Sequence, residues 1–219
     1  MKNWKVECHC HSDYSKDSLS GLEDLIQTAK KRGLDKLILT DHNTIQGAVR
    51  AQEMAPELII VGEEIKTTIG EFLAFFVKEE IPKGLSPQEA LQRLKAQDAF
   101  ISVSHPFDQM RHGWPLEALD QIRPFVDAIE VFNSRSLTAH LNDEALAYAE
   151  KYQLAGTVGS DAHTLPEVGR SYLELPPFED AESLRKVIAQ AQKICVYSTP
   201  FVRLGSSYAR FVKQIRKKI

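Results

Sequence analysis

The sequence has few cysteines and no long apolar run. Three cysteines occur among 219 residues, and an odd number of thiols without an export signal predicts reduced side chains rather than a disulfide framework. No segment reaches the roughly 20 apolar residues that a transmembrane helix needs. The amino-terminal segment also lacks the apolar core of a signal peptide. These absences predict a cytoplasmic protein that neither spans a membrane nor relies on disulfides.

Strong charge of one sign is also missing, except near the carboxyl end. The net charge is −3, which gives no global reason to expect nucleic-acid binding. Residues 203–218 nevertheless contain basic and no acidic side chains, and apolar residues recur there at helical spacing. We expect an amphipathic helix whose basic face consists of Arg203, Arg210, Lys213, Arg216, Lys217 and Lys218. Its simplest interpretation is a docking helix with solvated lysines, and the alternative is a contact with a phosphate backbone.

Short apolar runs alternate with helical patterns, and no linker, repeat or low-complexity segment interrupts them. We expect strands at 6–10, 36–40, 58–64, 72–77, 100–104, 128–132, 155–159, 171–175 and 194–197. We expect helices at 21–32, 44–54, 86–97, 115–122, 136–152 and 181–191, with Ser20, Asn43, Ser86 and Asp180 among the cap residues. Repeated strand–helix units predict a mostly parallel sheet. A local hairpin between Glu64 and Val77, with Lys66 and Glu71 in its loop, is the expected exception.

Residues that can bind metals lie at or just after the ends of these expected strands. They are His11, Asp41, His42, Glu64, His105, Asn133, Asp161 and His163. The carboxyl ends of barrel strands meet on one face, where active sites are built. His9 and His11 are two residues apart and therefore point to the same side of a strand, while Cys8 and Cys10 are expected to pack on the other side. The pattern predicts one composite site and leaves His140 outside it.

Four motifs carry a resemblance to a known family. They are His9-Cys10-His11 followed by Tyr14-Ser15-Lys16-Asp17-Ser18, then Thr40-Asp41-His42, Ser104-His105-Pro106 and Gly159-Ser160-Asp161-Ala162-His163. In this order they resemble the polymerase and histidinol phosphatase (PHP) family over nearly the whole chain. The resemblance implies a single α/β domain with a distorted, TIM-like (β/α)7 barrel. Residues 1–200 would form the barrel, and the basic tail at 201–219 would be part of the same domain.

The resemblance also implies two or three divalent ions. Their expected ligands are His9, His11, Asp17, His42, Glu64, His105, Asp161 and His163. The family pattern Gly-any-Glu selects Glu64 over Glu63. Many members have a histidine near position 133, where this chain has Asn133 preceded by Glu130. We therefore keep both Glu130 and Asn133 as candidate ligands.

The ligand types predict the chemistry. A mixture of imidazole and carboxylate favours zinc, manganese or iron over magnesium or calcium. Carboxylates such as Glu64 and Asp161 can bridge ions, and a hydroxide held between two ions is a nucleophile at neutral pH. We expect hydrolysis of a phosphomonoester or phosphodiester, with Asp161, His163, Glu64 and His42 as the catalytic residues. This chemistry requires no serine or cysteine nucleophile, and no glycine-rich phosphate loop stands out in the sequence.

Basic residues on loops of the same face are candidates for holding the substrate phosphate. They are Arg111, His112, Arg135 and Arg170, and arginine is favoured because its planar fork matches phosphate. Asp41 is expected to orient His42 or a bound water. A barrel of this length leaves little room for an inserted cap, so we expect an open pocket. The expected partner is a small phosphorylated substrate, a nucleotide or a short oligonucleotide, without an obligate protein partner.

Two alternatives stay open. An amidohydrolase-like metal hydrolase also begins with a His-any-His strand, but it usually has a lysine bridge where this chain offers Glu64, and it lacks the Asp161-any-His163 pair. A non-catalytic, metal-stabilised regulatory module is the other alternative. The nearly complete ligand set favours catalysis over that module.

Overall fold

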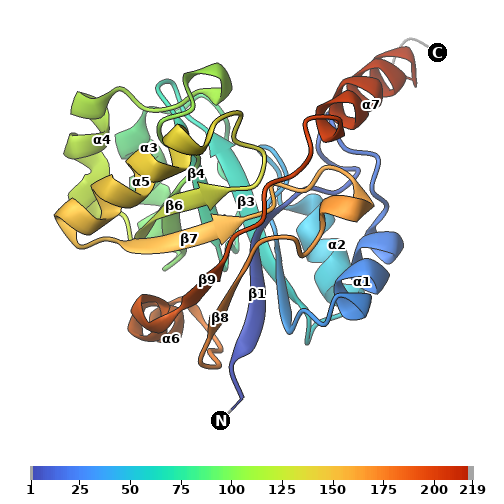
Figure 1. Cartoon of the computed structure of the whole chain (residues 1–219), viewed down its shortest axis with the longest axis horizontal. Helices are drawn as coiled ribbons and strands as arrows, with labels where there is room; N and C mark the ends of the chain where they lie inside the picture. The colour runs from blue at the N-terminus through green and yellow to red at the C-terminus, as the bar shows by residue number, and fades with distance from the viewer. Residues whose placement is uncertain (1, 217–219) are drawn as a thin grey trace.

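A curled nine-stranded sheet organises the part of the chain that this computed structural model describes, residues 2–216 (Figure 1). The strands are β1 Trp4–Cys10, β2 Lys36–Leu39, β3 Ile59–Lys66, β4 Glu71–Phe75, β5 Phe100–Val103, β6 Ala128–Asn133, β7 Ala155–Gly159, β8 Tyr172–Leu175 and β9 Gln192–Ile194. Their order is β7-β6-β5-β4-β3-β2-β1-β8-β9. All nine expected strands are present. β9 was expected at 194–197, but it begins at Gln192 and ends at Ile194.

The pairing is parallel within β1–β2–β3 and within β5–β6–β7. β4 runs antiparallel to both β3 and β5, which confirms the expected hairpin. Because β4 is reversed, its amino end lies on the face where the parallel strands have their carboxyl ends. Glu71, the first residue of β4, therefore reaches the same face as the residues that follow β1, β2 and β5.

The first seven strands nearly close into a barrel where β1 meets the end of β7. The His11 amide donates a hydrogen bond of 2.9 Å to the carbonyl oxygen of Ala162, and a bridge joins Cys10 to Ala162. Gly159 permits this approach, since a Cβ atom there would overlap the Cβ of His9. The expected distorted seven-stranded barrel is confirmed. β8 and β9 extend the sheet beyond β1 by antiparallel pairing.

Helices cover the outside of the barrel, except for the last one, which lies at its upper edge (Figure 1). They are α1 Leu22–Lys31, α2 Gln46–Met54, α3 Pro87–Ala96, α4 Leu116–Ile122, α5 Ala139–Tyr152, α6 Ala181–Val187 and α7 Val202–Arg216. Ser86 and Asp180 cap α3 and α6 as expected. The expected caps Ser20 and Asn43 are wrong, because α1 and α2 begin after Gly21 and Ile45.

Both displaced cap residues instead support the site face. The Ser20 hydroxyl donates to the carbonyl oxygen of His163 at 3.3 Å. Asn43 adopts a positive φ of 55°, and its side-chain oxygen accepts from the Lys66 amide at 2.9 Å. Ser and Asn side chains compete for backbone groups outside helices as readily as at helix caps. Residue type alone therefore did not distinguish a helix cap from a hydrogen bond to a neighbouring loop.

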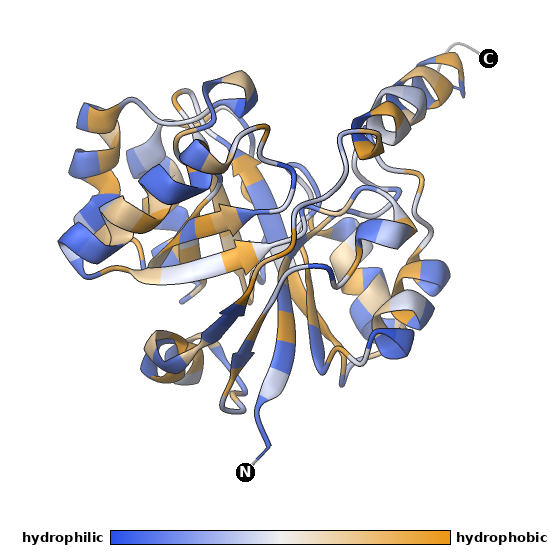
Figure 2. Ribbon diagram, in the orientation of Figure 1, coloured by the Kyte–Doolittle hydropathy of each residue, from blue (hydrophilic) through white to orange (hydrophobic). Residues whose placement is uncertain are grey.

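The apolar core fills the space between the sheet and its covering helices, while polar residues dominate the outer helix faces (Figure 2). Cys8 and Cys10 are buried in this core, which confirms their expected packing role. Between residues 2 and 216, no helix combines the length and apolar composition that crossing a membrane requires.

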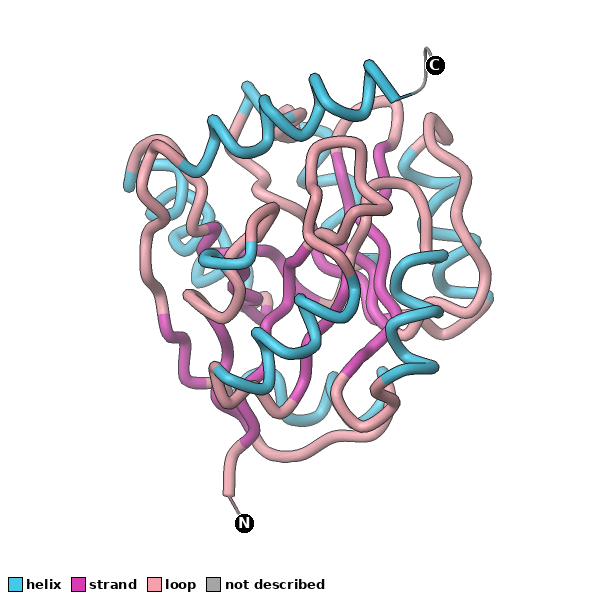
Figure 3. The backbone as a smooth tube through the Cα atoms, turned by 90° about the vertical axis from the view of Figure 1, so that its right-hand side faces the viewer, coloured by secondary structure: helices cyan, strands magenta, loops and turns pink. Residues whose placement is uncertain are grey.

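Helix α7 runs along one edge of the molecule (Figure 3). It confirms the expected amphipathic helix, with Ser206 and Ala209 buried against the body of the protein. Lys213 holds the helix down by donating to the carbonyl oxygens of Asp13 and Ser15 at 2.5 Å each. Lys217 and Lys218, which we expected to extend the basic face, lie outside the described residues.

Candidate functional site

The barrel brings the eight ligands expected from the motifs to one place. His9 comes from β1 and Glu64 from β3, and the other residues lie in loops that begin at the same face. The loop residues are His11, Asp17, His42, His105, Asp161 and His163. Seven of the eight side chains are buried, and His42 is partly exposed. The positive φ angles of His105 and Asp161, 21° and 52°, mark sharp backbone turns at two of these positions.

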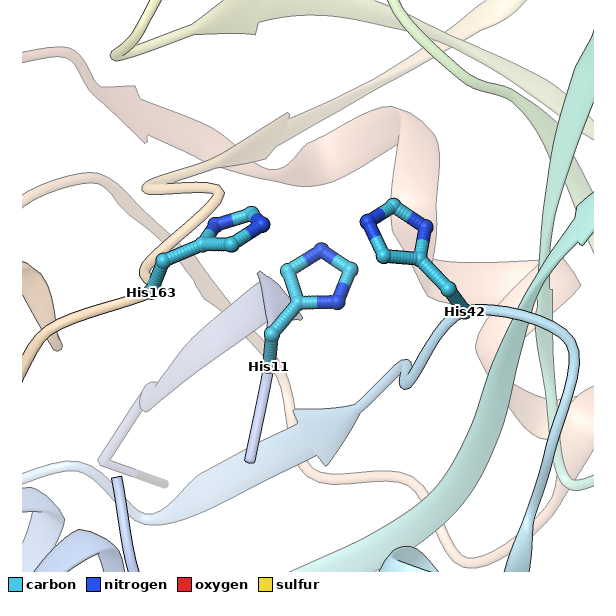
Figure 4. A group of neighbouring side chains, drawn as sticks. All are labelled: His11, His42 and His163. Atoms are coloured by element: carbon cyan, nitrogen blue, oxygen red, sulfur yellow. The ribbon is translucent and has the colours of Figure 1, made fainter. Parts of the chain in front are cut away.

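Three histidine rings form the first potential ligand group. The centroid of the His11 ring lies 4.4 Å from that of His42 and 4.2 Å from that of His163. Figure 4 shows the three rings around a common space, approached from three different segments of the chain. One nitrogen from each ring lies within 4.8 Å of the others. Asp17 Oδ1 adds a carboxylate oxygen 3.5 Å from His42 Nε2 and 3.4 Å from His163 Nε2.

A second group consists of His9, His11 and Asp161. The two histidine Nε2 atoms are 3.1 Å apart. Asp161 Oδ1 lies 3.6 Å from His9 Nε2 and 3.4 Å from His11 Nε2. Because His11 belongs to both groups, the two groups are adjacent.

The third group contains a residue that the sequence did not identify as a ligand. His105 Nε2 lies 3.1 Å from Glu64 Oε1 and 3.5 Å from Glu71 Oε2, and the three side chains form one buried set. Glu71 was expected only within the hairpin loop. The signal that identifies it is the reversal of β4, which places the amino end of that strand at the site.

Serine hydroxyls fix the orientation of His11. Ser15 Oγ donates its single proton to Asp41 Oδ1 at 2.6 Å, so it can only accept from its other neighbours. It therefore accepts from His11 Nδ1 at 3.1 Å and from the His42 amide at 3.0 Å. The proton of His11 is held at Nδ1, and Nε2 is directed into the site. Asp41, expected to orient His42 or a bound water, acts through Ser15 on both the His11 ring and the His42 amide.

Two other histidines are fixed in the same way. His9 Nδ1 lies 2.9 Å from Glu130 Oε1, and His163 Nδ1 lies 2.8 Å from the carbonyl oxygen of Asp161. A carbonyl oxygen can only accept, and a carboxylate normally does, so each Nδ1 carries a proton. The Nε2 atoms of His9 and His163 consequently point into the site as well. Such partners are typical of metal-binding histidines.

Glu130 and Asn133 lie behind the groups rather than between them. Glu130 Oε2 accepts from the His105 amide at 2.8 Å and from Asn133 Nδ2 at 3.1 Å, so both oxygens of this carboxylate are engaged. Asn133 Nδ2 also lies 3.3 Å from Asp161 Oδ2. This geometry suits residues that hold His9, His105 and Asp161 in place.

An unpaired buried oxygen and two facing ring nitrogens indicate that the donor set fits divalent cations. Asp17 Oδ1 is buried without a hydrogen-bond partner, which is costly for a polar group. A proton or a cation must also separate the Nε2 atoms of His9 and His11, because two lone pairs at 3.1 Å repel. A proton there would leave Asp17 Oδ1 unsatisfied. Nitrogen and oxygen ligands in this mixture suit zinc, manganese or iron.

Opposing charges polarise the site. Burial alone would raise the pKa of Asp161, but His9, His11 and Arg111 hold it well below its usual range. The pKa of Glu64 is likewise held low against burial by His9 and His42. Burial together with His163 and His42 lowers the pKa of His11 to about 3. Asp161 and Glu64 are therefore ionised at neutral pH, and His11 is neutral.

A cavity of about 420 Å³ opens above the three groups. Its lining includes three of the four expected phosphate-binding candidates, Arg111, His112 and Arg135. Arg111 Nη1 lies 2.5 Å from Asp161 Oδ2, while its Nη2 is buried without a partner. Arg135 is buried, and its Nε lies 3.2 Å from Glu167 Oε1. Arg170 is not among the lining residues and donates instead to the carbonyl oxygen of Tyr197 at 3.3 Å.

Helix α7 supplies a wall of this cavity that the motifs did not predict. Arg203, Ser206, Ser207 and Arg210 line it. Arg203 donates to the carbonyl oxygen of Arg135 at 2.6 Å, and Arg135 donates to Ser206 Oγ at 2.8 Å. Arg203 and Arg210 of the expected basic face are therefore turned toward the site, and the signal for them was the run of basic residues at helical spacing.

Comparison with known proteins places this site in a family. Residues 139–192 match the family model described as PHP-associated. The chain is 39% identical over 175 residues to the protein MJ0417 of Methanocaldococcus jannaschii, covering 78% of this chain and 70% of that one. It is 28% identical to an error-prone DNA polymerase of Pseudomonas fluorescens, covering 74% of this chain but only 18% of the polymerase.

A solved structure supports the same fold. A protein described as a candidate metal-dependent phosphoesterase from Bifidobacterium adolescentis superposes with a TM-score of 0.62 at 19% identity, covering 86% of this chain and 96% of that one. At this identity the likeness concerns the fold alone. Together with the sequence relatives and the four motifs, it leads to one assignment: the chain belongs to the polymerase and histidinol phosphatase (PHP) family.

Proposed function

We propose that this protein is a metal-dependent phosphoesterase with two or three divalent ions. The observation that carries the proposal is the adjacency of three buried ligand groups beneath a cavity rimmed with arginine. The first group would use His11, His42, His163 and Asp17, the second His9, His11 and Asp161, and the third Glu64, Glu71 and His105. Zinc, manganese or iron are the ions that these ligands favour.

When bound, the ions would supply Lewis acidity and lower the pKa of water at the site. The chain supplies the geometry. Glu64 lies between groups, with Oε1 3.1 Å from His105 Nε2 and Oε2 2.8 Å from His42 Nδ1. Asp161 has the equivalent position between His9 and His11. These two carboxylates would help to hold the ions, and His42 and His163 would complete the reacting centre.

Arg111 would hold the substrate phosphate. Its Nη1 already lies against Asp161 Oδ2, and its Nη2 is buried and unpaired at the edge of the same cavity. An unpaired guanidinium nitrogen in a buried position is costly unless an anion meets it. Arg203 and Arg210 face the same space from α7. Glu130 and Asn133 would act as positioning residues beneath them.

A basic groove next to the cavity supports a nucleotide or short oligonucleotide as substrate. The groove measures about 1,440 Å³ and shares Lys16, His42 and Arg210 with the metal cavity. Its remaining charged lining comprises Lys66, Lys83, Lys213 and Arg216 against Asp13 and Glu80. A groove with this excess of positive charge could hold phosphates beyond the one that reacts.

The test is phosphate release by the manganese-reconstituted protein from histidinol phosphate, nucleotides, bisphosphates and short oligonucleotides. His9→Ala serves as the blank, and His140→Ala, which alters an exposed histidine on α5, is the matched control. We expect wild type and His140→Ala to release phosphate and His9→Ala to release none. If neither wild type nor control releases phosphate with ions confirmed in place, the phosphoesterase proposal fails. The same preparations would then be assayed on amide substrates for the amidohydrolase alternative.

A further inference from the structure

The outer face of α7 carries an apolar stripe that is largely exposed to solvent in the described chain. It consists of Phe201, immediately before the helix, and Leu204, Tyr208, Phe211 and Ile215 within it. These side chains are between 43% and 77% exposed. Figure 2 shows apolar and polar residues alternating along this helix. Exposed apolar patches of this size on a soluble domain commonly mark an interaction site.

The stripe has the spacing of a coiled-coil seam. Its members follow one another at intervals of three, four, three and four residues, which is the a and d pattern of a heptad repeat. Side chains at this spacing form one narrow line along a helix and interlock with the same line on another helix. The stripe therefore fits a partner helix better than a globular pocket.

The residues beside the seam favour a second copy of this chain as the partner. The flanking e and g positions are Gly205, Ser207, Val212 and Gln214, none of which is charged. Charges at these positions normally select a partner of opposite charge and oppose self-pairing. Their absence between residues 201 and 216 leaves two identical helices free to associate. The net charge of −3 adds only weak repulsion between two copies.

The basic residues of α7 are occupied on the opposite side of the helix. Arg203 donates to Arg135, and Lys213 donates to Asp13 and Ser15. An interfacial membrane helix would present such residues to anionic headgroups beside its apolar stripe. Here two of them are tied to the protein body, which argues against a lipid surface as the partner.

We infer that two copies of this protein pair through α7 along this seam. The five side chains expose on the order of 500 Å² on each copy, so pairing would bury about 1,000 Å² in total, the lower limit of a specific interface. We expect a dissociation constant on the order of micromolar. Because the inner face of α7 lines the metal cavity, pairing would also fix Arg203 and Arg210 over both sites.

Sedimentation velocity across the micromolar range tests the pairing. We expect a reversible monomer–dimer equilibrium for wild type and monomers for Leu204→Glu and Phe211→Glu. Leu116→Glu on α4 is the matched control, since Leu116 is 57% exposed and lies outside the seam. Circular dichroism establishes that each variant is folded. A wild-type protein that stays monomeric, or a dimer that both seam variants retain, would overturn the inference.

Cross-linking provides a second measurement. Tyr208 occupies the middle a position of the seam, so it faces its own copy when the two helices pair parallel. In a Cys195→Ser background, which removes the exposed thiol, Tyr208→Cys should form an intermolecular disulfide and Leu116→Cys should not. Equal cross-linking of both would contradict the seam. Pelleting of monomers with phosphatidylserine-containing vesicles would identify a lipid surface instead and overturn self-pairing.

Discussion

The floor of the site and its rim are built in different ways. The floor consists of short, buried side chains at strand ends, and each of His9, His11 and His163 has one ring nitrogen fixed by a neighbouring acceptor. The rim consists of long arginines, two of which come from α7, about 40 residues beyond the last motif. Under the proposed function, backbone geometry would therefore fix the metal chemistry, whereas long side chains, two of them on a peripheral helix, would meet the substrate.

This difference separates what is constant from what can vary. A small shift of the floor would break several ligand groups at once, because His11 belongs to two of them. Under the proposed function, a change in Arg203 or Arg210 would alter which phosphates fit without removing a contact to any of these groups. Fold and chemistry can thus be shared across a family while the substrate changes.

The largest expected effect comes from removing the central carboxylate of the floor. Asp161→Asn preserves the side-chain volume and tolerates the positive φ of 52° at this position, so the barrel should fold. We expect phosphoesterase activity to fall at least about a hundredfold, since a charged group at the reacting centre is lost. The measurement is kcat/KM together with metal content by mass spectrometry. A variant with full activity and full metal content would exclude Asp161 from the site.

The floor was also the part that the sequence predicted well. Two-residue spacing on β1 and polar residues after β2, β5 and β7 were enough to bring His11, His42, His105 and His163 together. Glu71 was missed although the expected hairpin already reversed β4, because the expected strand began one residue later, at Phe72, and Glu71 lies in none of the four motifs. The α7 wall was missed for another reason. Its basic face was visible in the sequence, but the contacts that turn it toward the cavity, such as Arg203 with Arg135, are tertiary.

The next largest effect tests whether Ser15 supports the floor by fixing His11. Ser15→Ala removes the acceptor that holds the proton of His11 on Nδ1, so His11 should bind metal less well. We expect the metal dissociation constant to rise about 10- to 100-fold, as for other residues that support ligands. Competition with a chelator measures it.

Ser102→Ala is the matched control for this prediction. Ser102 is also a buried serine, but its hydroxyl bonds to Thr157 Oγ1 at 2.8 Å, within the barrel wall. It should lower stability without changing metal affinity. Equal losses of affinity in both variants would mean that Ser15 supports the fold in general rather than His11.

A substitution in the rim should change mainly KM. Arg203→Ala removes one charged contact from the cavity wall, and we expect KM to rise about tenfold with little change in metal content. Arg170→Ala is the control, because Arg170 donates to Tyr197 away from the cavity lining. A steeper dependence of KM on salt in wild type than in Arg203→Ala would agree with a phosphate contact. If Arg170→Ala alone changed KM, the site would have to extend beyond the cavity described above.

Changing Glu63 should have the smallest effect on catalysis. Glu63 is the neighbour of Glu64 on the opposite face of β3, so it tests the electrostatics of the floor. Burial raises the pKa of Glu63 to about 8, whereas the pKa of Glu64 is held low. Folding therefore favours protonated Glu63. As pH rises from about 4.5 to about 8, the folded state binds more protons than the unfolded state, and this residue's contribution makes stability fall by up to about 1.4 kcal/mol per pH unit.

Glu63→Gln should remove this loss of stability at high pH, because a glutamine side chain stays neutral. In the wild type the Ile81 amide donates to Glu63 Oε2 at 3.0 Å, and the glutamine oxygen can still accept this hydrogen bond. The measurement is the free energy of unfolding in urea for both proteins, with chelator present, at several values of pH. We expect the two proteins to be similar at pH 5 and the variant to be more stable at pH 8, with kcat unchanged. Parallel pH curves would mean that Glu63 titrates near its ordinary value, so that burial on that face of β3 does not separate the two glutamates.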